Sequence, residues 1–119
     1  MRTFLAYNRT RGVPLASKVQ LAGTLRARMK GLLGREDLLQ EMGLWIRPSQ
    51  GVHTIGMTFP IDVAYLDRDG RILRMYHRLA PFRIAAISMR TCSVLELPAG
   101  TLSRTQTAVG DILDFQPVK

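Results

Sequence analysis

Short runs in which hydrophobic and polar residues alternate recur along most of the chain, separated by clusters of Gly, Pro, Asn and Asp. An alternation of two residues is typical of a β-strand with one buried face, and such clusters are typical of turns. The clearest turn, Asp-Arg-Asp-Gly at residues 67–70, predicts a hairpin between the runs on either side. The whole pattern predicts strands at residues 3–7, 15–22, 43–47, 61–66, 71–77, 93–97 and 112–115.

One segment has a helical pattern instead. Hydrophobic residues recur at helical spacing from Leu25 to Leu33, which predicts one main helix over about residues 24–33. A short helix is predicted at about residues 101–106. Short strands with one clear helix favour an α+β domain with a mainly antiparallel sheet, or a small barrel. Residues 8–18 have two interpretations, a turn that leads into a strand or a mobile basic loop.

The net charge is concentrated in the first third of the chain. Residues 1–35 contain eight Arg and Lys residues and no acid, whereas nine bases and nine acids cancel in the rest, which accounts for the formal charge of +8. Arginine is a good bidentate partner for phosphate and carboxylate, so one interpretation is an anionic partner such as nucleic acid or a lipid surface. The other is a solvated basic face whose arginines pair with Asp62, Glu96 or Asp111.

Length and cysteine content limit the class of protein. A chain of 119 residues is expected to be a single domain, residues 1–119. Cys92 is the only cysteine, so no internal disulfide is expected, and no Cys/His spacing indicates a metal site or a cofactor. The sequence lacks the apolar core of a signal peptide and a run of about 20 apolar residues. We therefore expect a cytoplasmic protein that is a monomer or a weak dimer.

Three ionisable residues are weak candidates for catalysis. Asp62 stands among apolar neighbours on a predicted strand, and a half-buried carboxylate must be paired or hydrogen-bonded. It acts either as an acid/base group facing His53 or as an acceptor for backbone amides of residues 53–60 and for Arg28 or Arg35. His53 has the residue type of a general base, and Glu96 interrupts another apolar strand. No nucleophile stands out beside them.

The order and spacing of several segments resemble the domain of unknown function 192 family. The matching pieces are ARMKGLLGR (27–35), GLWI (43–46), GVHTIGMTFPIDVAYLDRDGRIL (51–73), AP-F-R (80–83), VLELPAG (94–100) and VGDIL (109–113). Many family members carry a Trp-Met-x-Asn-Thr run where this chain has His53 to Met57. The resemblance implies a bacterial or archaeal protein with a strand-rich α+β domain of barrel-like shape, and it implies no established reaction.

Three functional hypotheses follow. The first is a non-catalytic binding module with a cleft for a small ligand or peptide around residues 51–62. The second is binding of an anionic polymer through residues 1–35, and the third is a small acid/base hydrolase that uses His53 with Asp62 or Glu96. The ligand-binding residues predicted for the first hypothesis are Arg35, Trp45, His53, Met57 and Asp62.

Overall fold

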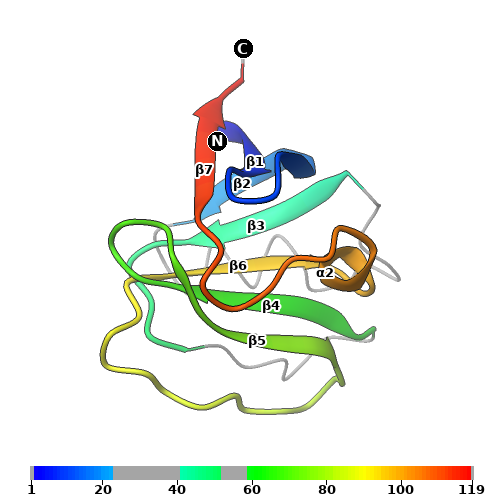
Figure 1. Cartoon of the computed structure of the whole chain (residues 1–119). Coiled ribbons are helices and arrows are strands. Elements are labelled where there is room, and N and C mark those ends of the chain that lie inside the picture. The colour runs from blue at the N-terminus through cyan, green and yellow to red at the C-terminus, as the bar shows by residue number, and fades with distance from the viewer. Residues whose placement is uncertain (1, 23–40, 52–58, 119) are drawn as a thin grey trace.

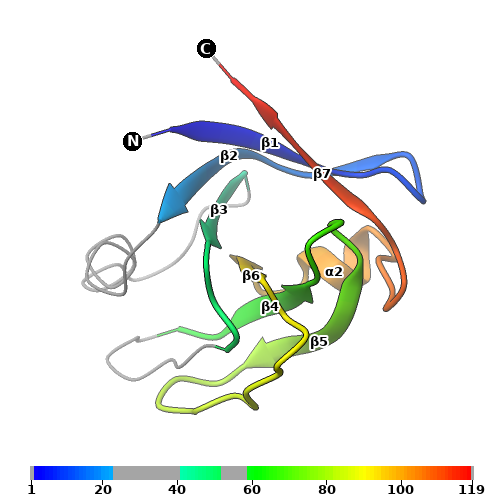
Figure 2. The same ribbon diagram turned by 90° about the vertical axis from the view of Figure 1, so that its left-hand side faces the viewer.

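The computed structural model describes residues 2–22, 41–51 and 59–118, and these form one seven-stranded sheet in the order β5-β4-β6-β3-β2-β1-β7. Figures 1 and 2 show that the sheet curls strongly into a half-barrel. The elements are β1 (Thr3–Asn8), β2 (Val13–Ala22), β3 (Met42–Ile46), β4 (Ile61–Leu66), β5 (Ile72–Leu79), β6 (Ser93–Pro98), α2 (Thr101–Arg104) and β7 (Leu113–Pro117).

The strand prediction agrees with this architecture, but the α+β class does not fully apply. In the ranges that the structure describes, the fold is mainly β and the one helix is α2, which corresponds to the short helix predicted at 101–106. The predicted main helix over 24–33 lies outside the described residues. Residues 13–18 belong to β2, which pairs with β1, so this part of the chain follows the interpretation of residues 8–18 as a turn leading into a strand.

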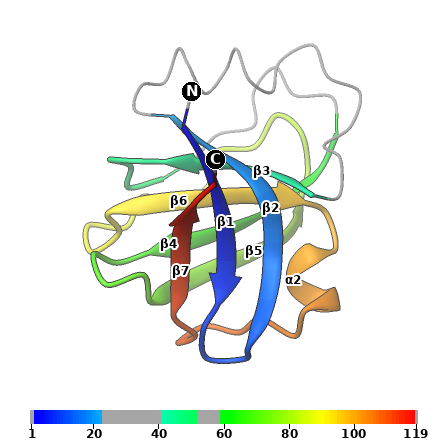
Figure 3. The same cartoon turned by 90° about the horizontal axis from the view of Figure 1, so that it is seen from above.

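One pair of neighbouring strands departs from the expected antiparallel arrangement. β2 and β3 run parallel, with Lys18 beside Met42 and Ala22 beside Ile46. Parallel neighbours need a crossover connection rather than a hairpin. The other strand pairs of the described sheet are antiparallel, and β1 pairs with both β2 and β7. Seen from above in Figure 3, β1, β2 and β7 lie across the strands β4, β5 and β6.

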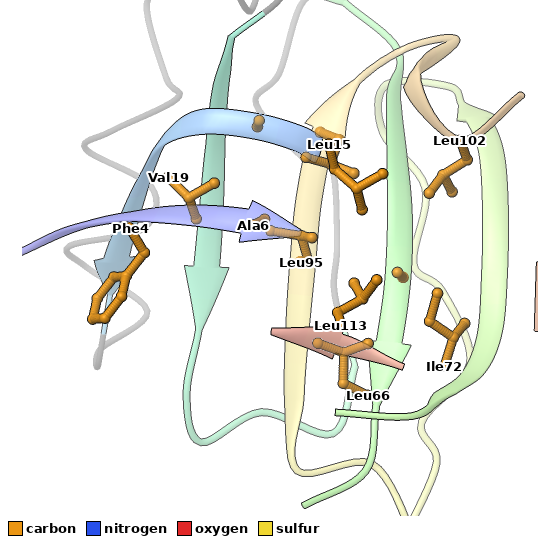
Figure 4. Close-up of a cluster of buried hydrophobic side chains, with 12 residues drawn as sticks. Phe4, Ala6, Leu15, Val19, Leu66, Ile72, Leu95, Leu102 and Leu113 are labelled. Atoms are coloured by element: carbon orange, nitrogen blue, oxygen red, sulfur yellow. The ribbon is translucent and has the colours of Figure 1, made fainter. Parts of the chain in front are cut away.

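The core has two parts because β4 and β6 are buried on both faces. Alternate side chains of β4 divide between them, as the sequence predicts: Ile61, Val63 and Tyr65 pack on one face, and Ala64 and Leu66 on the other. The second face is the inside of the half-barrel, shown in Figure 4. Its other buried members are Phe4, Ala6, Leu15, Ala16, Val19, Ile72, Leu95, Leu97, Leu102 and Leu113.

The two ends of the sheet approach each other at the β4–β5 turn. Leu113 donates its backbone N–H to the carbonyl of Gly70 at 2.8 Å, and Arg71 forms an isolated bridge with Ile112. Gly70 has φ +85°, and a Cβ at this position would clash with the Leu113 carbonyl oxygen. The turn therefore needs glycine both for its backbone conformation and for the close contact with β7.

Replacing Gly70 with Ala is expected to lower the free energy of unfolding by about 2 kcal/mol, since backbone strain and the contact with Leu113 both count. Gly110 is a matched control, because it has φ +97° and a Cβ there would meet nothing within 4 Å. Gly110→Ala should lower the free energy of unfolding by about 1 kcal/mol, because it adds backbone strain but no steric contact. Urea denaturation measures both, and equal losses would show that the contact with β7 contributes nothing.

Candidate functional site

Asp62 is fully buried and its carboxylate accepts three backbone hydrogen bonds. Oδ1 accepts from the N–H of Arg78 at 2.9 Å, and Oδ2 accepts from Gly100 at 3.1 Å and Leu102 at 2.9 Å. Gly100 is the N-cap of α2 and has no side chain to serve the free amides of the first turn, so Asp62 supplies the acceptor. The carboxylate thus joins β4 to the end of β5 and to the start of α2.

Among the described residues, the amide donors to Asp62 come from positions distant in the sequence, Arg78, Gly100 and Leu102. Most of the donors predicted from residues 53–60, and both Arg28 and Arg35, lie outside the described residues, so that part of the prediction stays a prediction. Arg78 stands where β5 shifts register opposite β4, and its φ is +52°. Acceptance by Asp62 therefore holds an irregular strand end in place, which is a structural role.

Glu96 and Asp62 do not meet. Glu96 lies opposite Val63 and Leu44 in the sheet, whereas Asp62 lies opposite Leu97, so the two acids point to opposite faces. Glu96 is buried on the face that carries Val63. The remaining predicted site residues, Arg35, His53 and Met57, lie outside the described residues, so the pairing of His53 with either acid stays a prediction.

Trp45 lies on β3 in an aromatic cluster. Its ring stacks on Phe115 of β7 with centroids 3.8 Å apart and an angle of 4°, and Phe4 of β1 meets it edge-on at 5.3 Å. The guanidinium of Arg47 lies 5.1 Å from the centre of the Trp45 ring. The indole Nε1 is buried and has no hydrogen-bond partner among the described residues. Three strands therefore fix the Trp45 side chain in one orientation.

A pocket of about 280 Å³ lies beside this aromatic cluster. One wall is formed by Trp45 and Phe115, and another by the β4–β5 turn, residues 67–70. The turn is stiff because Asp67 Oδ1 accepts backbone N–H groups from Asp69 at 2.9 Å and Arg71 at 3.0 Å. The remaining lining residues are Arg47, Leu66, Cys92, Ser93, Leu113 and Asp114. We call this the Trp45 pocket.

The Trp45 pocket contains charged groups of both signs. Arg47 and Arg68 contribute guanidinium groups, and Asp67, Asp69 and Asp114 contribute carboxylates. Asp114 is 3.5 Å from Arg9, whereas Arg47 and Asp69 form no ion pair with any residue that the structure describes. Sequence reasoning finds Trp45 but not Phe115 or Arg47. No local signal in the sequence shows that Phe115 of β7 and Arg47 after β3 come together beside Trp45.

A buried polar cluster ties the β1–β2 hairpin to the segment before β7. Asp111 Oδ2 accepts from Asn8 Nδ2 at 3.0 Å, Arg11 Nε at 2.9 Å and the N–H of Ala108 at 3.0 Å. Asn8 also donates to Thr107 Oγ1. Burial alone raises the pKa of Asp111, but the bonds from Asn8, Arg11 and Ala108 outweigh it and hold that pKa below its ordinary value.

The basic residues of the first third that the structure describes lie close to groups of the same molecule. Arg11 binds Asp111, Arg9 lies 3.5 Å from Asp114 and Lys18 lies 4.0 Å from Glu41. Arg2 lies over the ring of Phe4 at 5.1 Å. The pairing of arginines with acids expected from the sequence thus occurs, with Asp111 as a partner. Arg26, Arg28, Lys30 and Arg35 lie outside the described residues.

The described ranges contain neither a metal-binding cluster nor a membrane-spanning helix. Within them, no three His, Cys, Asp or Glu side chains lie where they could share a metal ion. His77 is exposed, and its Nδ1 lies 3.4 Å from Ser103 Oγ. No helix in the same part of the chain has the length and apolar character needed to cross a membrane.

The comparisons with known proteins identify the family. The family model for domain of unknown function 192 (DUF192), described as uncharacterized ACR, matches residues 6–115. The chain belongs to the DUF192 family. This confirms the resemblance seen in the sequence. The Trp45 pocket and the Asp62 carboxylate lie within the matched part of this DUF192 chain, whereas the β1–β7 pair lies only partly within it.

Individual relatives place the DUF192 chain among proteins without an assigned reaction. A "UPF0127 protein" from Thermococcus sibiricus is 25% identical over 114 residues, which cover 92% of this chain and 73% of the relative. A protein of unknown function from Novosphingobium aromaticivorans has a similar fold, with a TM-score of 0.80 at 21% identity over 95% of this chain and 84% of its own. A Sinorhizobium meliloti structure named a "putative transcription regulator" has a TM-score of 0.77 at 25% identity, and the match covers 96% of this chain and 92% of that structure's chain.

Proposed function

We propose that this DUF192 chain is a non-catalytic binding domain that holds a small ligand or a peptide end in the Trp45 pocket. The observation that carries the proposal is the fixed aromatic wall, in which Trp45 stacks on Phe115 in a pocket that Arg47 and Asp69 also line. Neither Arg47 nor Asp69 forms an ion pair within the described ranges. Binding sites typically combine rigid aromatic walls with a few polar groups that set orientation. This site differs from the cleft predicted around residues 51–62, of which residues 52–58 lie outside the described part.

The chemistry of the Trp45 pocket favours a ligand with both charges. Arg47 on one side suits a carboxylate, and Asp69 on the turn suits an ammonium group. A volume of about 280 Å³ is just below the range of about 300–1,000 Å³ in which drug-sized ligands bind. An amino acid or the end of a short peptide has the matching size and charge. The pocket lies apart from Asp62, whose oxygens already serve three amides.

Trp45 makes the test direct, because it is the only tryptophan of the chain. Its single indole N–H signal can be followed by NMR while amino acids and dipeptides are added. We expect at least one of them to shift this signal to saturation, and Arg47→Ser to weaken the apparent affinity about tenfold, since a charged hydrogen bond is lost. Cys92 lines the same pocket and is the only cysteine, so the bound ligand should also slow its labelling by a thiol reagent.

Arg104→Ser is the matched control, because Arg104 is an exposed arginine at the end of α2 and does not line the pocket. It should leave the affinity unchanged. If no compound shifts the indole signal at millimolar concentration, or if Arg47→Ser binds as tightly as the unaltered chain, the pocket is not the site. The anionic-polymer and hydrolase hypotheses stay predictions, since several residues on which they depend are outside the described ranges.

A further inference from the structure

The connection between β5 and β6, residues 80–91, exposes several large apolar side chains. Phe82, Ile84, Ile87 and Met89 are between 64% and 80% exposed, and the other exposed large hydrophobic residues of the described chain are Val109 and Val118. We call residues 80–91 the apolar loop. In Figure 1 it runs along the end of the molecule opposite the two termini. Exposed apolar side chains gathered on one segment are a common mark of an interaction surface.

The apolar loop is held in place by its backbone. Tyr65 Oη donates to the carbonyl of Ala86 at 2.6 Å, and the N–H of Ala86 donates to Tyr76 Oη at 3.1 Å. The N–H of Ser88 donates to the carbonyl of Gln50 at 2.9 Å. Ala85 packs into the core and Thr91 is buried at the end of the loop, whereas the large apolar side chains on either side of Ala85 are exposed. The exposure is thus imposed by the fold, and water must hydrate these side chains until something covers them.

The charged residues in the apolar loop and in the sequence on either side of it have one sign. From Gly70 to Leu95 the sequence contains five arginines and no Asp or Glu. Arg78 precedes the apolar loop, Arg90 lies near its end, and both are exposed. Neither forms an ion pair with another residue of the described ranges. A partner that covers the loop must therefore combine an apolar interior with an anionic surface.

We propose that the apolar loop docks on an anionic lipid bilayer. The apolar side chains would enter the boundary between headgroups and acyl chains, while Arg78 and Arg90 bind headgroup phosphates. A bilayer matches this surface better than an acidic protein does, because the four exposed side chains are spread over residues 82–89 and a bilayer accepts them without a complementary groove. The Trp45 pocket is not required for this interaction.

The experiment uses the full chain and sedimentation with vesicles. We expect binding to vesicles that contain phosphatidylglycerol, and weaker binding to phosphatidylcholine alone or at high salt, because screening removes the contribution of the arginines. Replacing both Ile84 and Ile87 with Ser should reduce the partition coefficient between vesicles and water by about tenfold or more. Each substitution removes the favourable free energy of transferring an isoleucine side chain into the apolar layer. Both residues are exposed, so the variant should keep its circular dichroism spectrum and melting temperature.

Val109→Ser is the matched control, since Val109 is 58% exposed and lies outside the apolar loop. It should bind vesicles like the unaltered chain. Failure of the unaltered chain to sediment with anionic vesicles would overturn the proposal, as would equal binding by the Ile84/Ile87 variant. If ultracentrifugation shows a dimer that this variant abolishes, and vesicle binding is absent, the loop covers a second copy of the chain instead.

Discussion

Replacing Asp62 with Ala should lower the free energy of unfolding by about 4 kcal/mol. The substitution leaves three backbone N–H groups without their acceptor, and each buried donor without a partner costs about 1–3 kcal/mol. The hydrogen bonds from the N–H groups of Arg78 and Gly100 are partly buried, and the bond from Leu102 is buried. The expected loss of stability therefore lies between the lowest and the highest sum of the three costs. The irregular end of β5 and the start of α2 both depend on this carboxylate. Urea denaturation followed by circular dichroism measures the change.

Asp62→Asn gives a second measurement that survives if Asp62→Ala does not fold. One oxygen remains as an acceptor while the amide nitrogen faces a donor, so about half of the loss is expected. Asp114→Ala is the control, because within the described part of the chain the Asp114 side chain makes only a long, exposed ion pair with Arg9, and its loss should change stability by less than about 1 kcal/mol. If Asp62→Ala cost no more than this control, the carboxylate would not be the structural link between β4, β5 and α2.

Replacing Asp111 with Ala should cost about 3 kcal/mol at neutral pH, because Asn8 and the Ala108 amide lose a buried acceptor and Arg11 loses its ion pair. The effect should depend on pH. Since the folded-state pKa lies below the ordinary value of 3.8, the unfolded chain takes up the proton first as pH falls. The contribution of Asp111 is therefore fully present above about pH 5 and is lost as pH falls through the lowered pKa.

The pH dependence is measured as the difference in stability between the unaltered chain and Asp111→Asn, from urea titrations at a series of pH values. The difference should be constant near neutrality and shrink under acid conditions. Asp69→Asn serves as control, because Asp69 is exposed and its side chain contacts no polar partner within the described ranges. A difference that grows on acidification would contradict the sign of the Asp111 pKa shift.

The strands are predictable from the sequence where local pattern and local structure coincide. β4 begins and ends at the predicted residues because an apolar run meets Pro60 at one end and the turn at residues 67–70 at the other. β5 extends beyond its prediction because Asp62, which lies on another strand, accepts a hydrogen bond from Arg78. The parallel pairing of β2 with β3 is not predicted because no local signal encodes a neighbour that is reached by a crossover.

The candidate site is predictable only in part. The sequence points to Trp45 as a pocket residue, but its stacking partner Phe115 belongs to a strand near the other end of the sequence, and hydrophobic periodicity does not say which strands become neighbours. The sequence assigns no element type to the apolar residues of the β5–β6 connection. A hydrophobic run ordinarily indicates burial, so only the fold reveals that Ile84 and Ile87 are exposed.

The pairing of β1 with β7 has a consequence for how the molecule is assembled during translation. Val118 donates its N–H to the carbonyl of Thr3, so two segments separated by nearly the whole described chain are direct neighbours. While the ribosome is still adding the intervening residues, the outer side of β1 has backbone groups that no later strand has yet covered. Completion of the sheet must wait for β7 to emerge, and a nascent chain stalled before that point carries an open edge on which another polypeptide can add.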